Sequence, residues 1–285
     1  SIGIVREYLV DSVGEVWGRY EVPKSAVEDV TQKRGKTGTG IVWSLESRGY
    51  IYVREDPSKA YDEAPNRVLS RAVARSEIQR LSIVLPAGNA AVQCARGDDI
   101  HRQSKTRVYG GDDIAFAYPP STGTASWTGE ETGNPVMSSV SPYNDEIPDV
   151  FGVSQQELVA MADIVVSNVG ELPPTLPDMS LIVISGNATF TNSRRMNGTG
   201  VLVVLGDLTV SSDSNSSYNG LIYTTGDYTQ NAPSIVSGSI VSKGEVYING
   251  TSDFSEIMYD SGVLTQIQRH MGQYRFNRNQ RFTAN

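Results

Sequence analysis

Short runs of apolar, mostly β-branched residues recur through the C-terminal half of the chain with a nearly constant period. Apolar runs such as Leu181–Ile184 and Val201–Val204 precede the glycines that mark the period, and a small polar or acidic residue follows each of the first four. Self-similarity at about 20 residues is the signature of a solenoid, in which each repeat buries the inward face of its neighbour. The glycines lie at intervals of 20, 20, 18 and 18 residues: Gly186, Gly206, Gly226, Gly244 and Gly262.

The repeat predicts a short right-handed β-helix of about four rungs, where a rung is one turn of the coil. Each repeat has room for two or three short strands, which is the make-up of a β-helix rung. Leucine-rich repeats have a similar length, but they require Leu at fixed offsets and an Asn or Cys in the turn. The present repeats have neither feature, so we expect a mainly β protein with this solenoid at its C-terminal end.

Alternating apolar and polar positions dominate residues 1–115 and predict an antiparallel sheet domain. Apolar positions recur every second residue near Val16 and again near Trp43. We expect a turn at 47–49, where a glycine follows two polar residues, and a long strand that starts near Val68 and ends at Pro86.

The segment between the two halves contains the clearest helix start in the chain. Residues 118–148 are rich in Pro, Ser, Thr and Gly and read as a loop. Ser154 and Glu157 then have the spacing of a capping box, so we expect a helix from about Gln155 to Val166. An exposed solenoid end must be covered, and we expect this helix to cap one end and residues 263–271 to cap the other.

Five segments follow from these patterns. They are a pilin-like antiparallel sheet domain (1–115), a Pro/Ser/Gly-rich linker (116–153), a capping helix with a Pro-rich approach (154–178), the β-solenoid (179–262) and a basic C-terminal tail (263–285).

Composition excludes several classes of function. A net charge of −8 and a pI of about 4.9 argue against nucleic acid as a partner, because a phosphate-binding face needs clustered Lys and Arg. No apolar run approaches the ~18 residues of a membrane-spanning helix. The chain begins at Ser1, so we expect any membrane attachment to come only from an N-terminal helix outside this sequence. Cys94 is the single cysteine and there are two histidines, which argues against a structural zinc site and excludes an internal disulfide.

The residues after the repeat glycines form the first candidate site. In-register rungs lie about 4.8 Å apart, so Asp207, Asp227 and Glu245 would form an acidic ladder together with Asn187. Such a ladder could bind Ca²⁺ or a cationic ligand. The alternative, which we favour, is that each acid marks a corner and bonds the backbone. No other cofactor or metal is indicated.

The basic tail forms the second candidate site. It interleaves aromatic residues with arginines and contains four Arg and no acid, whereas residues 1–260 carry −12. Aromatics alternating with Arg can stack on bases, but the acidity of the rest favours docking to a protein partner. The residues of this candidate docking site are Arg269, Tyr274, Arg275, Phe276 and Arg278.

The sequence gives no sign of catalysis, so we expect a protein that is not an enzyme. It lacks the G-x-S-x-G, HExxH and phosphate-loop motifs. Lyases built on β-helices combine clustered acids with a basic residue on one face. The basic residues in the repeats are only Arg194, Arg195 and Lys243, and none has a defensible position beside the acidic ladder.

The order of segments resembles the secreted part of PilX-like minor pilins, which are accessory subunits of type IV pilus systems. Residues 18–22 and 43–50 are similar to the paired strands of that family, and residues 71–75 leading to 85–87 follow in the same order. Residues 200–208, 220–227 and 259–264 look like its β-helix rungs and exit. The resemblance implies an antiparallel sheet that packs on an anchor helix, other pilus subunits or a pilus-associated adhesin as partners, and no catalytic residues.

Our expectation is therefore a non-enzymatic, extracellular or periplasmic subunit of a pilus-like machine, which displays its solenoid to a partner protein or a surface glycan. Two alternatives remain open. A β-helix module that binds or cleaves polysaccharides would need exposed aromatic residues, and the candidates in the repeats are Tyr223, Tyr228 and Tyr247. A bactofilin-like filament would stack solenoids end to end, which capped ends would prevent.

Overall fold

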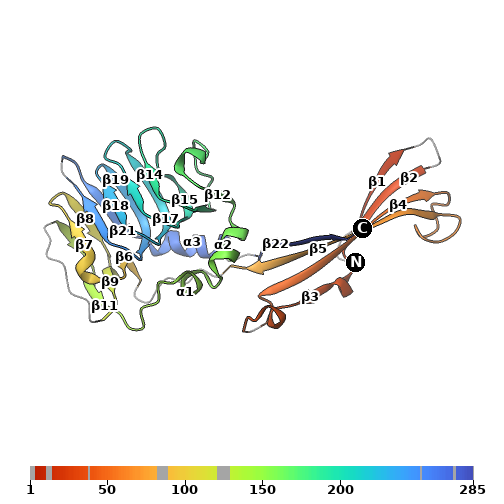
Figure 1. The fold of residues 1–285 in the computed structure, drawn as a ribbon, viewed down its shortest axis with the longest axis horizontal. Coiled ribbons are helices and arrows are strands. Elements are labelled where there is room, and N and C mark those ends of the chain that lie inside the picture. The colour runs from red at the N-terminus through yellow and green to blue at the C-terminus, as the bar shows by residue number, and fades with distance from the viewer. Residues whose placement is uncertain are drawn as a thin grey trace. The chain divides into compact units, whose positions relative to one another are not determined.

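The structure is a computed structural model of the whole chain. It describes the backbone of residues 4–10, 15–37, 39–81, 89–120, 129–250, 252–271 and 274–284, and the side chains of these residues apart from 4–10 and 277–284. Within these residues the chain forms two compact units (Figure 1). Unit 1 comprises residues 1–80 and 274–285, and unit 2 comprises residues 81–273. We describe each unit by itself.

Unit 1 is one antiparallel sheet, here called sheet 1, with the strand order β1-β2-β4-β5-β22 and β3 paired to β4. Its two long central strands form the scaffold, because β4 and β5 pair along almost their whole length. The predicted long strand after Val68 is present as β5, which ends at Arg80; the end predicted at Pro86 lies outside the described residues. The bounds are β1 Ile4–Val10, β2 Glu15–Glu21, β3 Val27–Asp29, β4 Val42–Arg54, β5 Arg67–Arg80 and β22 Tyr274–Ala284, with short 3₁₀ turns η1 Lys24–Ala26 and η2 Gln32–Arg34.

Two expectations for this region need correction. The turn predicted at 47–49 does not form, because Gly49 lies inside β4 between Tyr20 on one neighbour and Ala72 on the other, and both ladders hold it extended. The basic tail is not a free tail either. After a helix in unit 2, the chain returns to unit 1 as β22 and pairs with β5, so Phe276 lies opposite Ile78.

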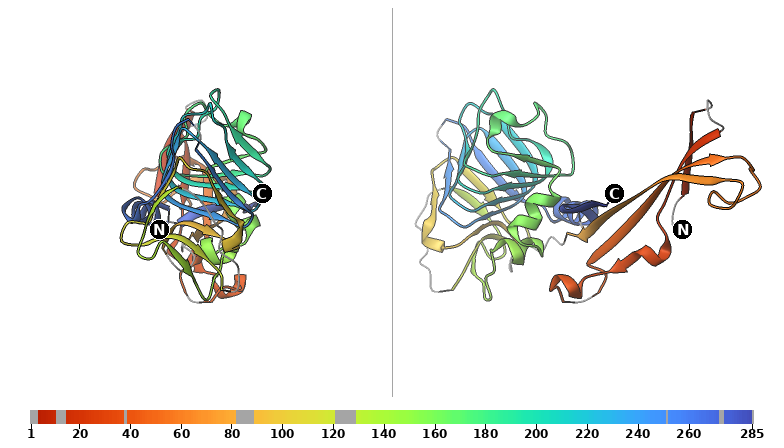
Figure 2. Two further views of the ribbon diagram at one scale, coloured as in Figure 1. Left: turned by 90° about the vertical axis from the view of Figure 1, so that its left-hand side faces the viewer. Right: turned by 45° about the vertical axis from the view of Figure 1, so that its right-hand side comes forward.

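Unit 2 is built on two parallel sheets between which the chain alternates (Figure 2). Sheet 2 has eleven strands, and its main path runs β10-β8-β21-β19-β17-β15-β13-β12. These are β10 Glu130–Thr132, β8 Thr106–Tyr109, β21 Ser255–Tyr259, β19 Ser234–Ser242, β17 Ser216–Thr224, β15 Asn197–Val204, β13 Ser180–Ile184 and β12 Ile164–Val166, with β6 Ala90–Cys94, β9 Ile114–Tyr118 and β11 Met137–Ser139 beside them.

Sheet 3 has the order β14-β16-β18-β20-β7 and receives the chain after each of the repeat strands. Its strands are β14 Ala188–Phe190, β16 Leu208–Val210, β18 Tyr228–Asn231, β20 Val246–Asn249 and β7 Ile100–Arg102, the last after the 3₁₀ turn η3 Gly97–Asp99. Repeats pair in register, so Gly200 lies opposite Gly220, and Gly220 lies opposite Gly238. The predicted period is therefore the offset in sequence between residues that pair in the two parallel sheets. Its fifth glycine, Gly262, lies instead in helix α3, Ser261–Met271.

The boundaries predicted at residues 115 and 153 are both corrected by the pairing. Strand β6 continues the sheet beyond β19, with Val92 opposite Ile240, and β8 pairs with β21. Strands β9, β10 and β11 extend the same sheet further. Residues 90–139 are thus part of unit 2 and not of an N-terminal sheet or a linker. Their strands pair with strands that lie some 150 residues later in the chain.

The core of unit 2 lies in two layers. Between sheets 2 and 3, every second side chain of the repeat strands points inward, for example Ile182, Leu202 and Ile222. The alternate side chains on the outer face of sheet 2, such as Val203 and Leu221, are also fully buried. A strand buried on both faces reads as a continuous apolar run, which explains the runs without alternation in the sequence.

Three helices cover the outer face of sheet 2, which corrects the predicted role of the helices as end caps. They are α1 Ile147–Phe151, α2 Gln155–Met161 and α3, and they share one apolar cluster with the outer residues of sheet 2. Unit 2 also contains the 3₁₀ turn η4, Val169–Glu171. Ser154 and Glu157 form the predicted capping box. The helix stops at Met161 and not at Val166, because residues 164–166 pair with β13 as β12.

Close backbone contact between repeats requires glycine. Gly220 has φ +150°, and a Cβ there would lie 2.0 Å from the carbonyl oxygen of Gly200. The same contact recurs one repeat later, where a Cβ on Gly238 would lie 2.0 Å from the oxygen of Gly220. Real Cβ atoms do not approach an oxygen so closely, so any larger residue would force adjacent repeats apart.

We expect Gly220→Ala to lower the free energy of unfolding by more than about 3 kcal/mol, because backbone strain and overpacking add. Gly111→Ala is the control, since Gly111 has φ +64° but no atom near its Cβ position, and it should cost about 1 kcal/mol. Urea denaturation followed by circular dichroism measures both. Equal losses for the two variants would contradict the backbone-contact explanation.

Candidate functional site

The predicted acidic ladder is present as a column of side chains at the corner between sheets 2 and 3. The Asp207 Oδ1 accepts a hydrogen bond from the backbone N–H of Asp227 at 3.0 Å, and Asp227 Oδ1 accepts one from the N–H of Glu245 at 2.8 Å. Asn187 begins the column and accepts from the N–H of Asp207 at 3.0 Å. We call Asn187, Asp207, Asp227 and Glu245 the corner column.

Asp207 and Asp227 therefore bond the backbone of the next repeat, and not their own backbone as the favoured alternative assumed, whereas the Glu245 carboxylate is bonded by side chains. The side chains also explain the glycines that precede them. A Cβ on Gly226 would lie 2.1 Å from Asp207 Oδ1, so a residue with a side chain there would displace the bonded carboxylate. The primary role of the column is structural, since it links successive repeats.

A stacked aromatic pair lies beside Glu245, the last residue of the corner column. His101 on β7 stacks on Tyr247 with ring centroids 4.6 Å apart, and its Nε2 lies 3.1 Å from a carboxylate oxygen of Glu245. The Tyr247 hydroxyl donates to the same oxygen. The hydrogen bond from Tyr247, followed by that from His101, lowers the pKa of Glu245 below its usual value.

The corner column spaces its carboxylates one per repeat. Among the described residues, no group of three or more His, Cys, Asp or Glu side chains could hold a metal ion. The reason is geometric, since the column places one carboxylate per repeat along a line, whereas Ca²⁺ needs six to eight oxygens around one point.

The candidate docking residues of the tail are divided between the two units. Arg269 is exposed on α3 in unit 2, whereas Tyr274, Arg275 and Phe276 lie on β22 in unit 1. Tyr274 and Phe276 are both exposed, the latter by 65%. The backbone of Arg278 belongs to β22, but its side chain falls outside the described residues.

The tyrosines expected to offer an exposed platform to sugars are mostly inside the protein. Tyr223 and Tyr228 are fully buried, and so is Tyr218. The Tyr223 hydroxyl donates to the backbone oxygen of Asp145 at 2.8 Å. Only Tyr247 is accessible among the candidates in the repeats, and His101 stacks on one face of its ring.

Sheet 1 of unit 1 carries a feature that the sequence analysis missed. Side chains of residues that pair directly across strands lie on the same face, and one face of strands β2, β4 and β5 has no charged residue between Trp43 and Ile51 or between Ser70 and Ile78. We call it the uncharged face. Its residues are Gly18, Tyr20, Trp43, Leu45, Ser47, Gly49, Ile51, Ser70, Ala72, Ala74, Ser76 and Ile78.

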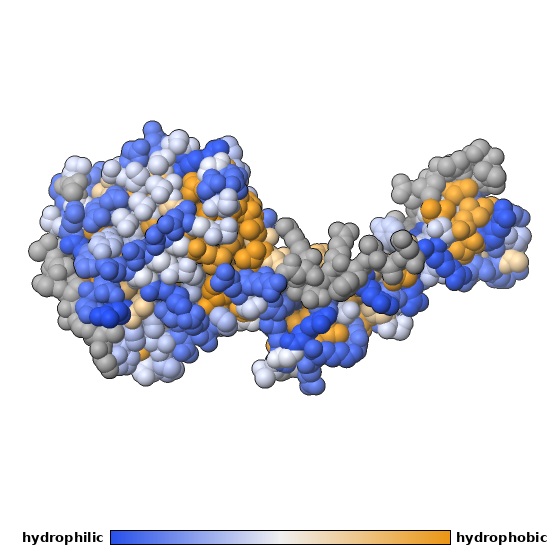
Figure 3. All heavy atoms as spheres, in the orientation of Figure 1, coloured by the Kyte–Doolittle hydropathy of each residue, from blue (hydrophilic) through white to orange (hydrophobic). Residues whose placement is uncertain are grey.

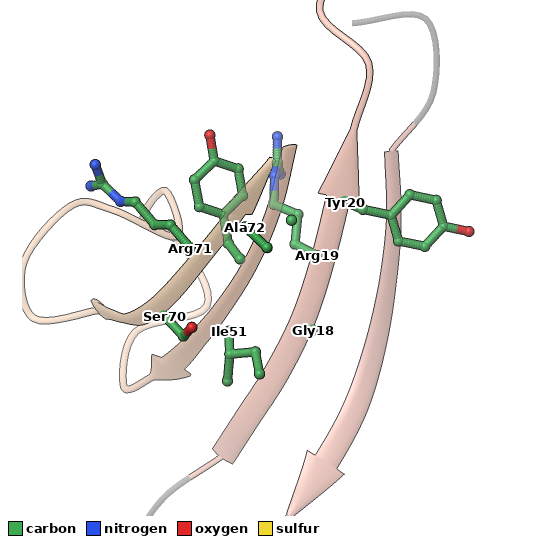
Figure 4. Close-up of a pocket in the computed structure, with 9 residues that line it drawn as sticks. Gly18, Arg19, Tyr20, Ile51, Ser70, Arg71 and Ala72 are labelled. Atoms are coloured by element: carbon green, nitrogen blue, oxygen red, sulfur yellow. The ribbon is translucent and has the colours of Figure 1, made fainter. Parts of the chain in front are cut away.

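None of these twelve residues is buried, although most are apolar or small. Tyr20 is 54% and Ile51 40% exposed. A hollow of about 250 Å³ lies among Gly18, Tyr20, Gly49, Ile51, Ser70 and Ala72 and is also lined by Arg19, Tyr50 and Arg71 (Figure 4), where Ile51 points to the side of the sheet opposite to Arg71. Apolar surface is also visible on unit 1 among strongly hydrophilic residues (Figure 3).

The opposite side of sheet 1, here called the arginine face, is charged and partly covered. Tyr61 from the loop between β4 and β5 packs on Tyr50 with a centroid distance of 4.7 Å, and the Arg19 guanidinium lies 4.5 Å from the Tyr61 centroid. Asn66 holds this loop, since its Oδ1 accepts from the backbone N–H groups of Glu55 and Asp56 at 2.8 Å each.

Unit 1 consequently has very little core of its own. The buried apolar residues of its described part are only Val16, Val30, Val42, Tyr52 and Val53. A single sheet layer needs a second layer to bury its apolar face. Among the described residues, no second layer buries the uncharged face.

Comparisons with protein-family models, curated proteins and solved structures found no match for this chain. Among the described residues, no helix is long and apolar enough to cross a membrane. Any functional inference therefore depends on the surfaces described above.

We expect Asp227→Ala to lower the free energy of unfolding by about 1 kcal/mol, because the N–H of Glu245 loses its acceptor. Asp227→Asn keeps an acceptor oxygen in the same place, as Asn187 does at the start of the column, and should change stability by less than about 0.5 kcal/mol. Urea denaturation compares the two variants. Equal losses for Asn and Ala would indicate that the charge, and not the hydrogen bond, matters.

Tyr247→Phe should raise the pKa of Glu245 toward the ordinary value of about 4.3, since the larger of its two stabilising hydrogen bonds is removed. Carboxyl ¹³C NMR titration measures the shift, with Tyr20→Phe in unit 1 as the control. A lowered pKa stabilises the fold above the unfolded-state pKa, and this contribution is lost as the pH falls through the folded-state pKa. An unchanged Glu245 pKa in Tyr247→Phe would show that the contact is unimportant in solution.

Proposed function

We propose that this protein is a non-enzymatic structural and interaction subunit of a type IV pilus-like cell-surface assembly. In this proposal unit 1 is the attachment module and unit 2 is a body displayed outside the cell or in the periplasm. The observation that carries the proposal is the uncharged face, which leaves a single-layer sheet without a second layer in the described chain.

The partner that best fits the uncharged face is an apolar α-helix. Small residues are frequent on the face (Gly18, Gly49, Ala72, Ala74), whereas Trp43 lies at one end of it and Ile51 at the other. A helix packed on a sheet buries one apolar stripe against the sheet, and small side chains let its backbone come close. The resemblance to PilX-like minor pilins supplies the same partner, namely the hydrophobic anchor helix of a pilus subunit.

Unit 2 suits the role of a displayed body. We interpret its two in-register parallel sheets as a right-handed β-solenoid, since the chain alternates between them at the repeat period. The fully buried inner and outer layers make it rigid and self-sufficient. Other pilus subunits, a pilus-associated adhesin or a surface glycan are the partners it would meet, with no cofactor required.

The two alternatives receive less support from the described residues. Burial of Tyr223 and Tyr228 removes most of the aromatic platform that a polysaccharide module would use. A filament of stacked solenoids uses the ends of sheets 2 and 3, and it gives no role to the uncharged face of unit 1.

A charge placed on the uncharged face should abolish attachment. We expect Ala72→Arg to reduce the amount of protein recovered with the cell-surface filament fraction of the source cells at least tenfold, because docking would bury an unpaired charge. Ala72→Ser keeps a small uncharged side chain and should behave as the wild type. Thr209→Arg adds the same charge to the outer face of sheet 3 in unit 2 and should also leave recovery unchanged.

Unchanged recovery of the Ala72→Arg protein, with wild-type circular dichroism, would overturn the proposed attachment through this face. Equal loss for Ala72→Arg and Thr209→Arg would mean that added charge acts nonspecifically, and it would also count against the proposal.

A further inference from the structure

The two units have opposite net charges. Unit 1 contains 16 Lys and Arg against 12 Asp and Glu, a net charge of +4. Unit 2 contains 8 Lys and Arg against 20 Asp and Glu, a net charge of −12. Opposite charges on two parts of one molecule favour contacts between unlike parts of neighbouring copies, because potentials of opposite sign steer association.

On the arginine face of sheet 1, Glu46 lies beneath two arginines, whereas Glu28 on β3 is exposed and paired with Lys33. A carboxylate oxygen of Glu46 accepts from Arg48 at 2.9 Å, and its second oxygen accepts from Arg75 at 2.9 Å. The Glu46 side chain is only 18% exposed, whereas Arg48 is 42% and Arg75 61% exposed. The carboxylate fixes the two arginines in place, and solvent meets the guanidinium groups.

Two more features prepare this face for an acidic partner. Arg71 lies two positions from Val73 on the same side of β5, is exposed, and forms no ion pair with the described residues. A polar hollow of about 530 Å³ opens beside Arg48 and Arg75 and is also lined by Ser25, Ser44, Glu28 and Glu46. Both carboxylates are already paired, Glu28 with Lys33 and Glu46 with the two arginines, so the hydroxyl and exposed guanidinium donors are what the hollow offers to further carboxylate groups.

The corner column of unit 2 offers carboxylates in a matching line. Asp207 and Asp227 use oxygens to bond neighbouring repeats, yet neither forms an ion pair with the described residues. Repeats are about 4.8 Å apart, so the column spans about 10 Å from Asp207 to Glu245. Arg71 and Arg75 are four residues apart on a strand, about 13 Å, which lies within reach of flexible arginine side chains on such a column.

We infer that the arginine face of unit 1 binds the corner column of unit 2 of a second copy, so that copies join head to tail. The two copies contribute different surfaces to the contact, so every dimer still has one free arginine face and one free corner column. It can extend into longer chains. The inference does not depend on which partner covers the uncharged face, because that face is on the other side of sheet 1.

Sedimentation velocity of the full chain at low and moderate salt tests the inference. Salt of about 0.15 M shortens the screening length from about 30 Å at 0.01 M to about 8 Å, so we expect association to weaken at least tenfold. Arg71→Gln with Arg75→Gln should weaken association at low salt at least tenfold. Arg194→Gln with Arg195→Gln changes the net charge equally at unit 2 and should leave it unchanged.

Asp207→Asn with Asp227→Asn tests the other side of the contact, since asparagine preserves the acceptors that link the repeats. This variant should also associate at least tenfold more weakly. A mixture of the arginine variant and the asparagine variant should form dimers but no longer chains, because each contributes one intact surface. That result is specific to a head-to-tail contact.

A chain that stays monomeric at low salt would overturn the inference, and so would association unaffected by either pair of substitutions. Association that strengthens with salt would also overturn it, since apolar contact through the uncharged face would then hold the copies together. In that case the proposed attachment function would stand. The Ala72→Arg variant also separates the two proposals. If less of it is recovered with the filament fraction while its sedimentation is unchanged, the uncharged face serves attachment and plays no part in the contact between copies.

Discussion

The close contact between successive backbones at the glycine positions is the constraint on which unit 2 depends. At Gly220 the next repeat approaches so nearly that even a methyl group would overlap a carbonyl oxygen. The same exclusion operates at the corner, where the carboxylate of Asp207 occupies the space above Gly226. These two contacts fix both the spacing and the register, since a slip of one residue would place a side chain into occupied space. The strands of successive repeats then pair in parallel and in register.

In-register stacking determines what the remaining residues of unit 2 can do. Aligned repeats bring identical positions together, so apolar side chains form continuous inner and outer layers and polar ones form columns. The outer layer of sheet 2 would be exposed without α1, α2 and α3, which cover it with Leu158, Leu264 and Ile267 among others. The helices are therefore part of the core. Carboxylates fall in line for the same reason, which gives the corner column its regular spacing.

Local patterns predicted the features that local interactions determine. The capping box at Ser154, the long strand β5 and the period of the repeats all depend on residues near one another in the chain, and each is present. The pairing of β6 with β19 joins residues about 150 positions apart, and nothing in either segment specifies its partner. The pairing of β22 with β5 also joins distant segments, so it could not be predicted, and the alternation of Arg and aromatic residues in β22 suggests a docking tail instead. The uncharged face was visible in principle, since alternate positions of 43–51 and 70–78 lack charge, but assigning them to one surface required the register of β4 and β5.

The contrast between the units indicates where function should be sought. Unit 2 satisfies its own requirements: the repeat strands of sheet 2 have apolar side chains buried on both faces, and Asp207 and Asp227 bond the adjacent repeats. Unit 1 does not to the same degree, because the described part of its sheet buries only five apolar residues to offset the entropy lost on ordering. A sheet of this kind gains stability when its free face is covered, so binding and folding are linked in unit 1. Natural selection for a stable isolated protein would place apolar residues under a second layer within the chain. Their exposure on one uncharged face, opposite a face of presented arginines, is instead what assembly with other molecules would select.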